Sequence, residues 1–146
     1  MFGFNLELTI SHLLHLAAAY ALALPIAWDR EQRSMGAGLR TFPLVAMGSC
    51  GYMMTGLSVL EGDPNANSRV IYGLITGMGF IGGGAILKGQ HRVTGTATAA
   101  GLWNTGVIGI AIAWDRFDIA IITSLLSFLT FRYFSRFKRE PEEQED

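Results

Sequence analysis

The densest group of side chains able to do chemistry lies in the stretch WDREQRSMGAGLRT. Asp29, Arg30 and Glu31 stand near its start, and Arg40 and Thr41 end it. Paired carboxylates in this pattern can neutralise an arginine or hold a hydrated divalent cation, because Mg²⁺ usually keeps several waters and uses one or two carboxylates. Asp29 and Glu31 are therefore candidate metal ligands. The alternative, which residue type alone favours, is a set of ordinary interfacial charges.

A second stretch, GMGFIGGGAILKG, begins at Gly77 and matches the G-x-G-x-x-G pattern of dinucleotide sites. That chemistry also needs a preceding strand and an acidic residue about 20 positions further on. The next acidic residue is Asp115, beyond another apolar stretch. A P-loop is excluded too, because the lysine lacks both the G-x-x-x-x-G-K register and a following Ser or Thr. These glycines are not expected to bind phosphate.

Close packing between helices in lipid is the preferred interpretation, because small residues at intervals of four let backbones approach. One row is Gly73 with Gly77, another is Gly79 with Gly83, and the next apolar stretch repeats small residues from Ala97 to Ala113. These two helices are expected to pack tightly through glycine faces. A break at the triple glycine is the alternative. The candidate packing or hinge residues are Gly73, Gly77, Gly79, Gly82, Gly83, Gly84, Gly101 and Trp103.

Other polar groups lie within the apolar stretches. His12 and His15 share a helix face and, with Glu7, could form a proton or metal path. No third ligand follows at a helical spacing, so hydrogen bonding to neighbouring helices is favoured. Thr98 and Asn104 could line an aqueous notch or bond across helices. The predicted functional polar cluster comprises Asp29, Arg30, Glu31, Arg40, Thr41, Thr98 and Asn104.

The elements that must position these residues are indicated by long gaps between charges. Half of the 146 residues are hydrophobic and 16% are charged, below the roughly 25% of an average soluble domain. A spanning helix needs roughly 20 mostly apolar residues. The sequence therefore predicts an all-α, polytopic membrane protein with five transmembrane helices packed through Gly and Ala faces. They are expected at Leu8–Ala27, Leu39–Leu60, Val70–Leu87, Ala97–Ala113 and Phe117–Phe134.

Lysine and arginine counts predict the topology, because cytoplasmic loops are enriched in these residues. Alternate sides hold nine and two, which places the N-terminus outside and the C-terminus in the cytoplasm. Residues 1–134 form the predicted transmembrane domain, and 135–146 a polar cytoplasmic tail. No cleavable signal peptide is apparent. The small-residue faces also predict a homo-oligomer, with a dimer favoured. No nucleophile–base pair and no basic stripe with interleaved aromatics is present, so neither an enzyme nor a nucleic-acid partner is expected.

Three ordered blocks resemble the MgtC/SapB family of bacterial inner-membrane proteins. DRE from Asp29, followed by AGLRT, is similar to the family's G-L-E-R-E and A-G-L-R-T. GMGFIGGGAI from Gly77 is similar to G-I-G-F-L-G-A-G-x-I. The stretch from Val93 to Trp103 is similar to V-x-G-L-T-T-A-A-x-x-W, although Thr96 and the next alanine replace Leu-Thr. Asp29 stands where the family usually has Glu, and the resemblance is expected to be to a short form without the family's C-terminal soluble domain.

This resemblance implies a role in magnesium homeostasis, growth at low Mg²⁺ and virulence-linked survival under host stress. It also implies action on membrane partners, including the ATP synthase or a Mg²⁺ transporter, and it favours a functional role for Arg30, Glu31 and Arg40. The favoured hypothesis is a non-enzymatic regulator. The alternative is a transporter or channel for Mg²⁺ or another cation, with its site at the cytoplasmic ends of the first two helices.

Overall fold

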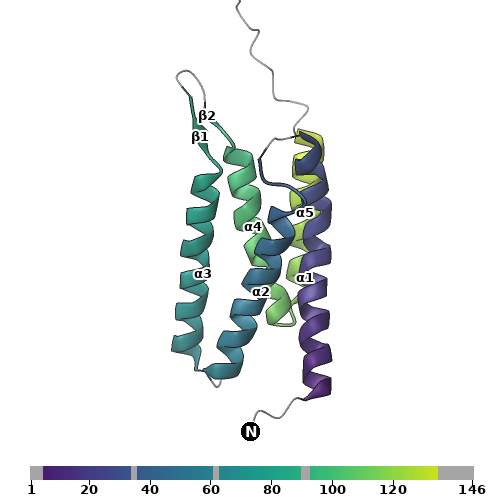
Figure 1. Ribbon diagram of the computed structural model, residues 1–146, viewed down its shortest axis with the longest axis vertical. Helices are drawn as coiled ribbons and strands as arrows, with labels where there is room; N and C mark the ends of the chain where they lie inside the picture. The colour runs from purple at the N-terminus through teal and green to yellow at the C-terminus, as the bar shows by residue number, and fades with distance from the viewer. Residues whose placement is uncertain (1–4, 34–35, 61–62, 90–92, 135–146) are drawn as a thin grey trace, which may run out of the picture.

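The computed structural model describes residues 5–33, 36–60, 63–89 and 93–134, which form an elongated helical bundle (Figure 1). The all-α membrane fold predicted from the sequence is confirmed. A short antiparallel hairpin, in which Leu87 pairs with Thr94, joins the third and fourth helices. The elements are α1 (Leu6–Arg33), α2 (Thr41–Val59), α3 (Pro64–Gly84), β1 (Leu87–Lys88), β2 (Val93–Thr94), α4 (Thr96–Ala113), α5 (Phe117–Leu129) and the π-helix η1 (Thr130–Phe134).

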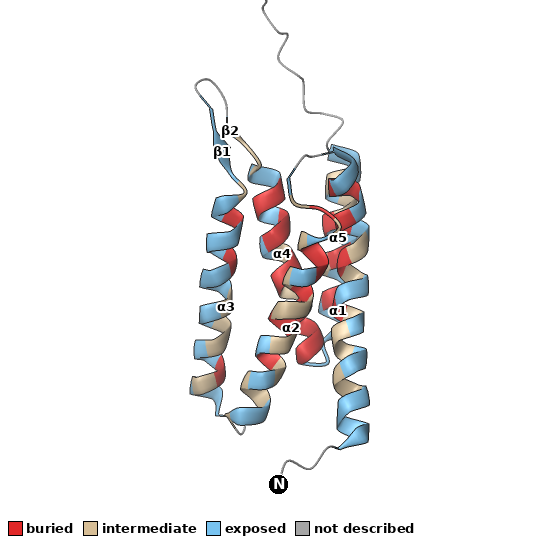
Figure 2. Cartoon of the chain, in the orientation of Figure 1, coloured by how far each residue is buried: buried red, intermediate tan, exposed pale blue. Residues whose placement is uncertain are grey.

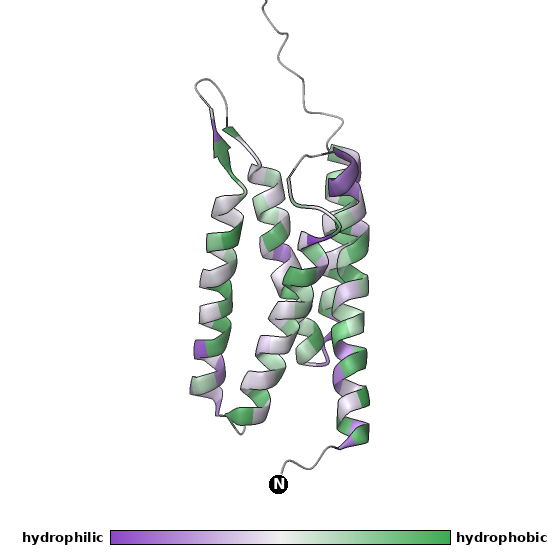
Figure 3. Cartoon of the chain, viewed as in Figure 1, coloured by the Kyte–Doolittle hydropathy of each residue, from purple (hydrophilic) through white to green (hydrophobic). Residues whose placement is uncertain are grey.

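All five predicted helices are present, and their ends differ from the predicted ones by up to six residues. Within the described residues, α1, α2, α4 and the continuous α5–η1 segment are long and apolar enough to cross a membrane. The helix α3 is not one of these four, because its glycines and asparagines lower its mean hydropathy. Its 21 residues nevertheless extend about 30 Å, the thickness of a hydrocarbon core. Many large hydrophobic residues are exposed on the bundle, as expected for contact with lipid, and hydrophobic residues occur along all of its long helices (Figure 3).

The helix α3 begins six residues before the predicted span because its start has its own capping signal. The side chain of Asp63 accepts a hydrogen bond from the backbone N–H of Asn65, and Pro64 occupies the first helical position. Asp at the N-cap followed by Pro is a favoured helix start. The charge-based prediction overlooked this signal because it placed the start of the span after Arg69.

The core of the bundle is built around α4, which packs against α1, α2, α3 and α5. Most of α4 is buried, whereas α3 is largely exposed (Figure 2). Small residues on α4 make the close approaches possible. A Cβ atom at Gly109 would lie 2.8 Å from the backbone nitrogen of Cys50 on α2. One at Gly101 would lie 2.6 Å from the ring of Phe131.

The helices α3 and α4 do pack against each other, with Gly82 near Ala99 and Gly106 near Met78, but the predicted glycine rows do not meet. On α3, only Gly82 would bring a Cβ atom close to α4, at 3.3 Å from the Ala99 carbonyl oxygen. The buried row on α4 that contains Gly101 and Gly109 faces other elements instead. The triple glycine does not break α3, which continues to Gly84. The remaining α3 glycines would each meet nothing within 4 Å, and these are Gly73, Gly77, Gly79, Gly83 and Gly84.

The connections sort to opposite ends of the bundle. The α1–α2 connection, the β1–β2 hairpin and the end of η1 lie at one end, and the α2–α3 and α4–α5 connections lie at the other (Figure 1). We call the first the arginine-rich end, because Arg33, Arg40 and Arg132 lie there. The predicted polar tail, 135–146, falls outside the described residues.

Candidate functional site

The arginine-rich end buries two adjacent charged residues of α1. Only 2% of Asp29 and 8% of Arg30 are exposed, although charged side chains are seldom this deeply buried without partners. The α1 helix continues through these residues to Arg33, six positions beyond its predicted end at Ala27. The additional turns carry Asp29 and Arg30 into contact with the rest of the bundle.

The carboxylate of Asp29 is only partly satisfied. Its Oδ1 atom accepts a hydrogen bond of 2.9 Å from Nε of Arg33, one helical turn further on. Its Oδ2 atom is buried and has no hydrogen-bond partner among the described residues. A buried carboxylate oxygen in this state gains strongly from a donor, a proton or a cation.

The guanidinium of Arg30 stacks on an aromatic ring from the far end of the chain. Its Cζ atom lies 4.6 Å from the centroid of the Phe131 ring, a cation–π geometry. Phe131 belongs to η1, and single π-helical turns often mark functional sites. The ring also packs over Gly101, where no side chain blocks its approach. Arg30 therefore joins the end of α1 to α4 and η1.

Glu31 faces the α1–α2 connection rather than Asp29. Its Oε2 atom accepts a hydrogen bond of 2.9 Å from the backbone N–H of Leu39. A Cβ atom at Gly38 would collide with this carboxylate, so the contact requires glycine there. Glu31 consequently helps to fix the backbone of the AGLRT segment, and one carboxylate oxygen of Glu31 already accepts a hydrogen bond.

The other predicted site residues do not join this contact network. Arg40 is exposed at the N-cap position of α2, and Thr41 is half-buried. Thr98 is buried near the start of α4. The amide of Asn104 lies deeper in the bundle and donates to the hydroxyl of Ser127 at 3.3 Å, linking α4 to α5. The predicted cluster is thus divided among several separate contacts.

No group of three or more His, Cys, Asp or Glu side chains is placed to hold a metal ion within the described parts of the chain. Asp29 keeps one free oxygen, and Glu31 is directed to a backbone amide. Direct ligation at this end would therefore use Asp29 with waters, as a hydrated Mg²⁺ ion permits.

Sequence reasoning missed three partners at the functional candidates. Phe131 and Arg33 contact the buried charges of α1, and Asp115 binds His15 at the opposite end of the bundle. The spacing of four between Asp29 and Arg33 was a readable signal for a helical ion pair. Nothing in the sequence pairs Phe131 with Arg30, because helix packing brings these distant residues together.

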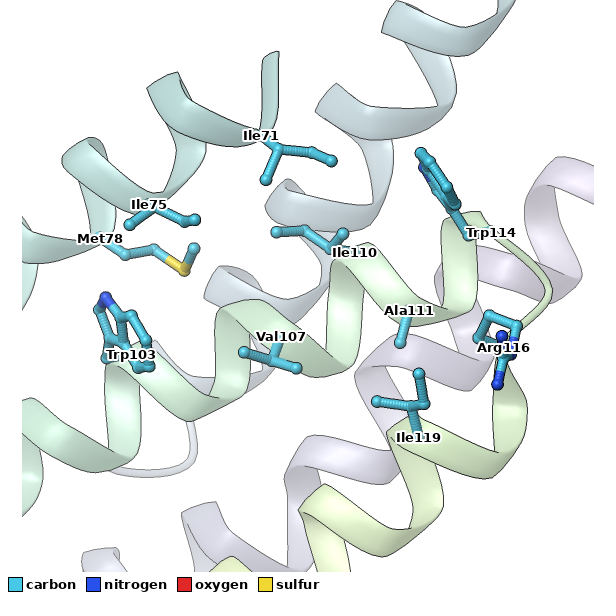
Figure 4. Close-up of a pocket in the computed structure, with 10 residues that line it drawn as sticks. All are labelled: Ile71, Ile75, Met78, Trp103, Val107, Ile110, Ala111, Trp114, Arg116 and Ile119. Atoms are coloured by element: carbon cyan, nitrogen blue, oxygen red, sulfur yellow. The ribbon is translucent and has the colours of Figure 1, made fainter. Parts of the chain in front are cut away.

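A separate apolar pocket of about 290 Å³ lies against α4, between α3 and the start of α5 (Figure 4). Trp103 lies at one end of it, and Trp114 and Arg116 lie at the other. Trp103 therefore lines this pocket between α3 and α4. The lining suits contact with apolar groups and offers no catalytic pair. It consists of Ile71, Ile75, Met78, Trp103, Val107, Ile110, Ala111, Trp114, Arg116 and Ile119.

The bundle and its buried charged end define an all-α membrane protein. The MgtC family model matches residues 16–140, and the chain belongs to the MgtC family. It is 35% identical over 137 residues to "Protein SrpB" of Synechococcus elongatus, covering 85% of this chain and 75% of that protein.

Two further relatives carry names that bear on function. The chain is 32% identical to the "Putative magnesium transporter YhiD" of Escherichia coli, covering 87% of this chain and 62% of YhiD. It is 31% identical to "Protein MgtC" of Salmonella typhimurium, covering 82% of this chain and 50% of MgtC. The chain thus spans about half to two thirds of the length of these two relatives. No solved structure matches it.

Proposed function

We propose that this MgtC family protein supports magnesium homeostasis as a non-enzymatic regulator of membrane partners in the bacterial inner membrane. The observation that carries the proposal is that three charged side chains at the arginine-rich end are engaged in contacts within the protein. Arg30 stacks on Phe131, Asp29 bonds to Arg33, and Glu31 holds a backbone amide. These contacts stabilise one shape of the arginine-rich end. A continuous ion path would instead need polar groups along the bundle, and the pocket beside α4 is apolar.

Transport of Mg²⁺ is the second candidate function. It is favoured by the buried Oδ2 atom of Asp29, which lacks a partner among the described residues. The name of the relative YhiD points the same way. In this alternative, Asp29 binds a hydrated ion at the ends of α1 and α2.

A flux experiment separates the two functions. Purified protein in proteoliposomes is compared with its Asp29→Asn variant, and entrapped dye reports Mg²⁺ uptake. Asp63→Asn is the matched control, because Asp63 is an exposed N-cap residue at the other end and Asn caps equally well. Saturable flux that Asp29→Asn abolishes and Asp63→Asn retains would establish transport. Flux equal to that of empty liposomes, from protein that restores growth at low Mg²⁺, supports the regulator.

The proposal includes a sidedness and an assembly state. The arginine-rich end faces the cytoplasm, and the N-terminus lies outside, in keeping with the excess of basic residues at that end. The protein forms a homodimer through the outward face of α3, where five glycines are open. Single-molecule photobleaching in nanodiscs measures this state, and one-step bleaching of a folded protein would contradict the dimer.

A further inference from the structure

His15 joins two distant parts of the bundle at the end opposite the arginine-rich end. Its Nδ1 atom lies 2.7 Å from the backbone oxygen of Ser11, one turn earlier in α1. Its Nε2 atom lies 2.9 Å from Oδ1 of Asp115, in the connection between α4 and α5. The side chain contact thus ties α1 to a turn 100 residues later in the chain.

The two hydrogen-bond partners of the His15 ring determine how many protons the ring and Asp115 must hold between them. A carbonyl oxygen and a carboxylate oxygen both accept hydrogen bonds, whereas a neutral imidazole has only one N–H. Both contacts form together only if the ring is an imidazolium or if Asp115 carries the proton and donates it to Nε2. Either form holds one proton more than a neutral imidazole beside a carboxylate.

We propose that His15 and Asp115 form a proton-dependent latch that fastens α1 to the α4–α5 turn. When the shared proton leaves, the neutral ring has one N–H for two acceptors, so either the Ser11 contact or the Asp115 contact loses its hydrogen bond, and the attraction between an imidazolium and a carboxylate is lost in both cases. The latch is therefore tightest at low pH and weakens as pH rises through the range in which the pair loses its proton. This device does not depend on the proposed function.

The backbone of the turn is shaped to present the carboxylate. Asp115 has φ of 55°, in the left-handed region, which Asp and Asn tolerate better than most residues. Its N–H donates to the carbonyl of Ile112 at 3.0 Å, and that of Arg116 donates to Ala111 at 2.9 Å. The ring of Phe117 lies 6.0 Å from that of His15 at 51°. The position of the Asp115 carboxylate is thus set by backbone hydrogen bonds as well as by its contact with His15.

Other charged groups near the latch are few or already paired. Arg116 donates to both oxygens of Asp118, at 3.1 and 2.9 Å, and this hydrogen bonding raises the pKa of Arg116. The helices α2 and α4 contain no charged residue. On α1 itself, the nearest titratable groups along the chain are His12, Tyr20 and Glu7. The side chain of Asp115 is 78% exposed at the surface of the bundle.

The test uses the full chain in lipid nanodiscs, with hydrogen exchange at residues 114–118 and ¹⁵N spectra of the histidines. Asp115→Asn is the informative variant, because its amide donates to Nε2 while the neutral ring donates Nδ1–H to Ser11. His15→Gln assigns the ring signal. Asp118→Asn is the matched control, since it alters a neighbouring carboxylate that does not touch His15.

In the wild-type protein at about pH 7, near the usual histidine range, we expect a His15–Asp115 pair that retains its extra proton. Exchange at the turn, corrected for intrinsic rates, should rise about tenfold between about pH 6 and pH 8.5, as for loss of one charged hydrogen bond. Asp118→Asn should keep this rise, and Asp115→Asn should abolish it. Two results would overturn the latch. One is a neutral His15 ring beside an unprotonated Asp115 across the whole pH range, and the other is an equal rise of exchange with pH in folded Asp115→Asn.

Discussion

At the scale of single residues, two glycines in neighbouring helices differ in what a methyl group would meet. A Cβ atom at Gly109 would collide with the Ala46 carbonyl and lie 2.8 Å from the Cys50 nitrogen, both backbone atoms of α2. At Gly77 a Cβ atom would meet nothing within 4 Å. We expect Gly109→Ala to destabilise the bundle by about 1–3 kcal/mol, the usual cost of overpacking. Unfolding in detergent micelles measures this.

Gly77→Ala serves as the control for that experiment. Alanine is favoured over glycine within a helix by up to about 1 kcal/mol, so this variant should be neutral or slightly more stable. Equal destabilisation by both substitutions would show that the close contact between α2 and α4 is not what makes Gly109 necessary.

Glu31 offers a second test at this scale. Replacing Glu31 with Ala removes the acceptor for the Leu39 N–H and should lower stability by about 1 kcal/mol, with faster hydrogen exchange at Leu39. Glu31→Gln retains a side-chain oxygen that can accept the same hydrogen bond. It should therefore protect Leu39 nearly as well as the wild type. If Gln and Ala have the same effect, the negative charge matters more than the hydrogen bond.

At the scale of elements, the π-helix η1 holds the ring that covers Arg30. Phe131→Leu should lower stability by about 0.5–2 kcal/mol, because the buried guanidinium loses its cation–π partner. Phe128→Leu is the control, since Phe128 is a half-buried core residue of α5. Chemical denaturation of Arg30→Met and of the double variant completes a mutant cycle. Additive effects would contradict a direct Arg30–Phe131 interaction.

The β1–β2 hairpin depends on one glycine at its junction with α4. Gly95 has φ of 85°, and a Cβ atom there would collide with the Ala85 carbonyl. Gly95→Ala should therefore cost at least about 1–2 kcal/mol and loosen the hairpin. Hydrogen exchange at Thr94 should increase, while exchange at Ile108 in the buried centre of α4 stays slow. An unchanged hairpin would show that the junction can relax.

The sequence was sufficient to predict the helices, because long gaps between charges reflect the cost of placing ions in hydrocarbon. The sequence was insufficient to predict which face of each helix packs against which neighbouring helix. Glycines at intervals of four identify surfaces that permit close approach, but they do not identify the neighbour. Gly109 faces α2, and Gly77 faces outward. The hairpin was missed because its strands have two residues each, too few for an alternating pattern.

At the scale of the whole molecule, the sidedness of the bundle can be measured with single cysteines. Asn65→Cys lies at the start of α3, and Lys88→Cys lies in the hairpin at the arginine-rich end. In intact spheroplasts, a membrane-impermeant maleimide should label only Asn65→Cys. Lys88→Cys should react after permeabilisation. The native Cys50 is buried and serves as the unreactive background. The reverse pattern would invert the proposed topology.

Of the candidate site, the sequence predicted only the charged residues of α1 and of the α1–α2 connection. Asp29, Arg30 and Glu31 are close in sequence, so their charges could be recognised together. Their partners come from segments whose placement depends on the complete bundle. The same is true of His15, whose partner Asp115 lies in the last connection.

These long-range pairs have a consequence for biosynthesis. The helix α1, which contains His15 and Arg30, is synthesised before their partners Asp115 and Phe131, which lie at the two ends of the α5–η1 segment. During synthesis α1 therefore has a charged residue not yet covered until the α5–η1 segment has entered the bilayer. A chain that stalls before α5 exposes this unfinished surface to membrane quality-control proteases, which can distinguish it from the completed protein.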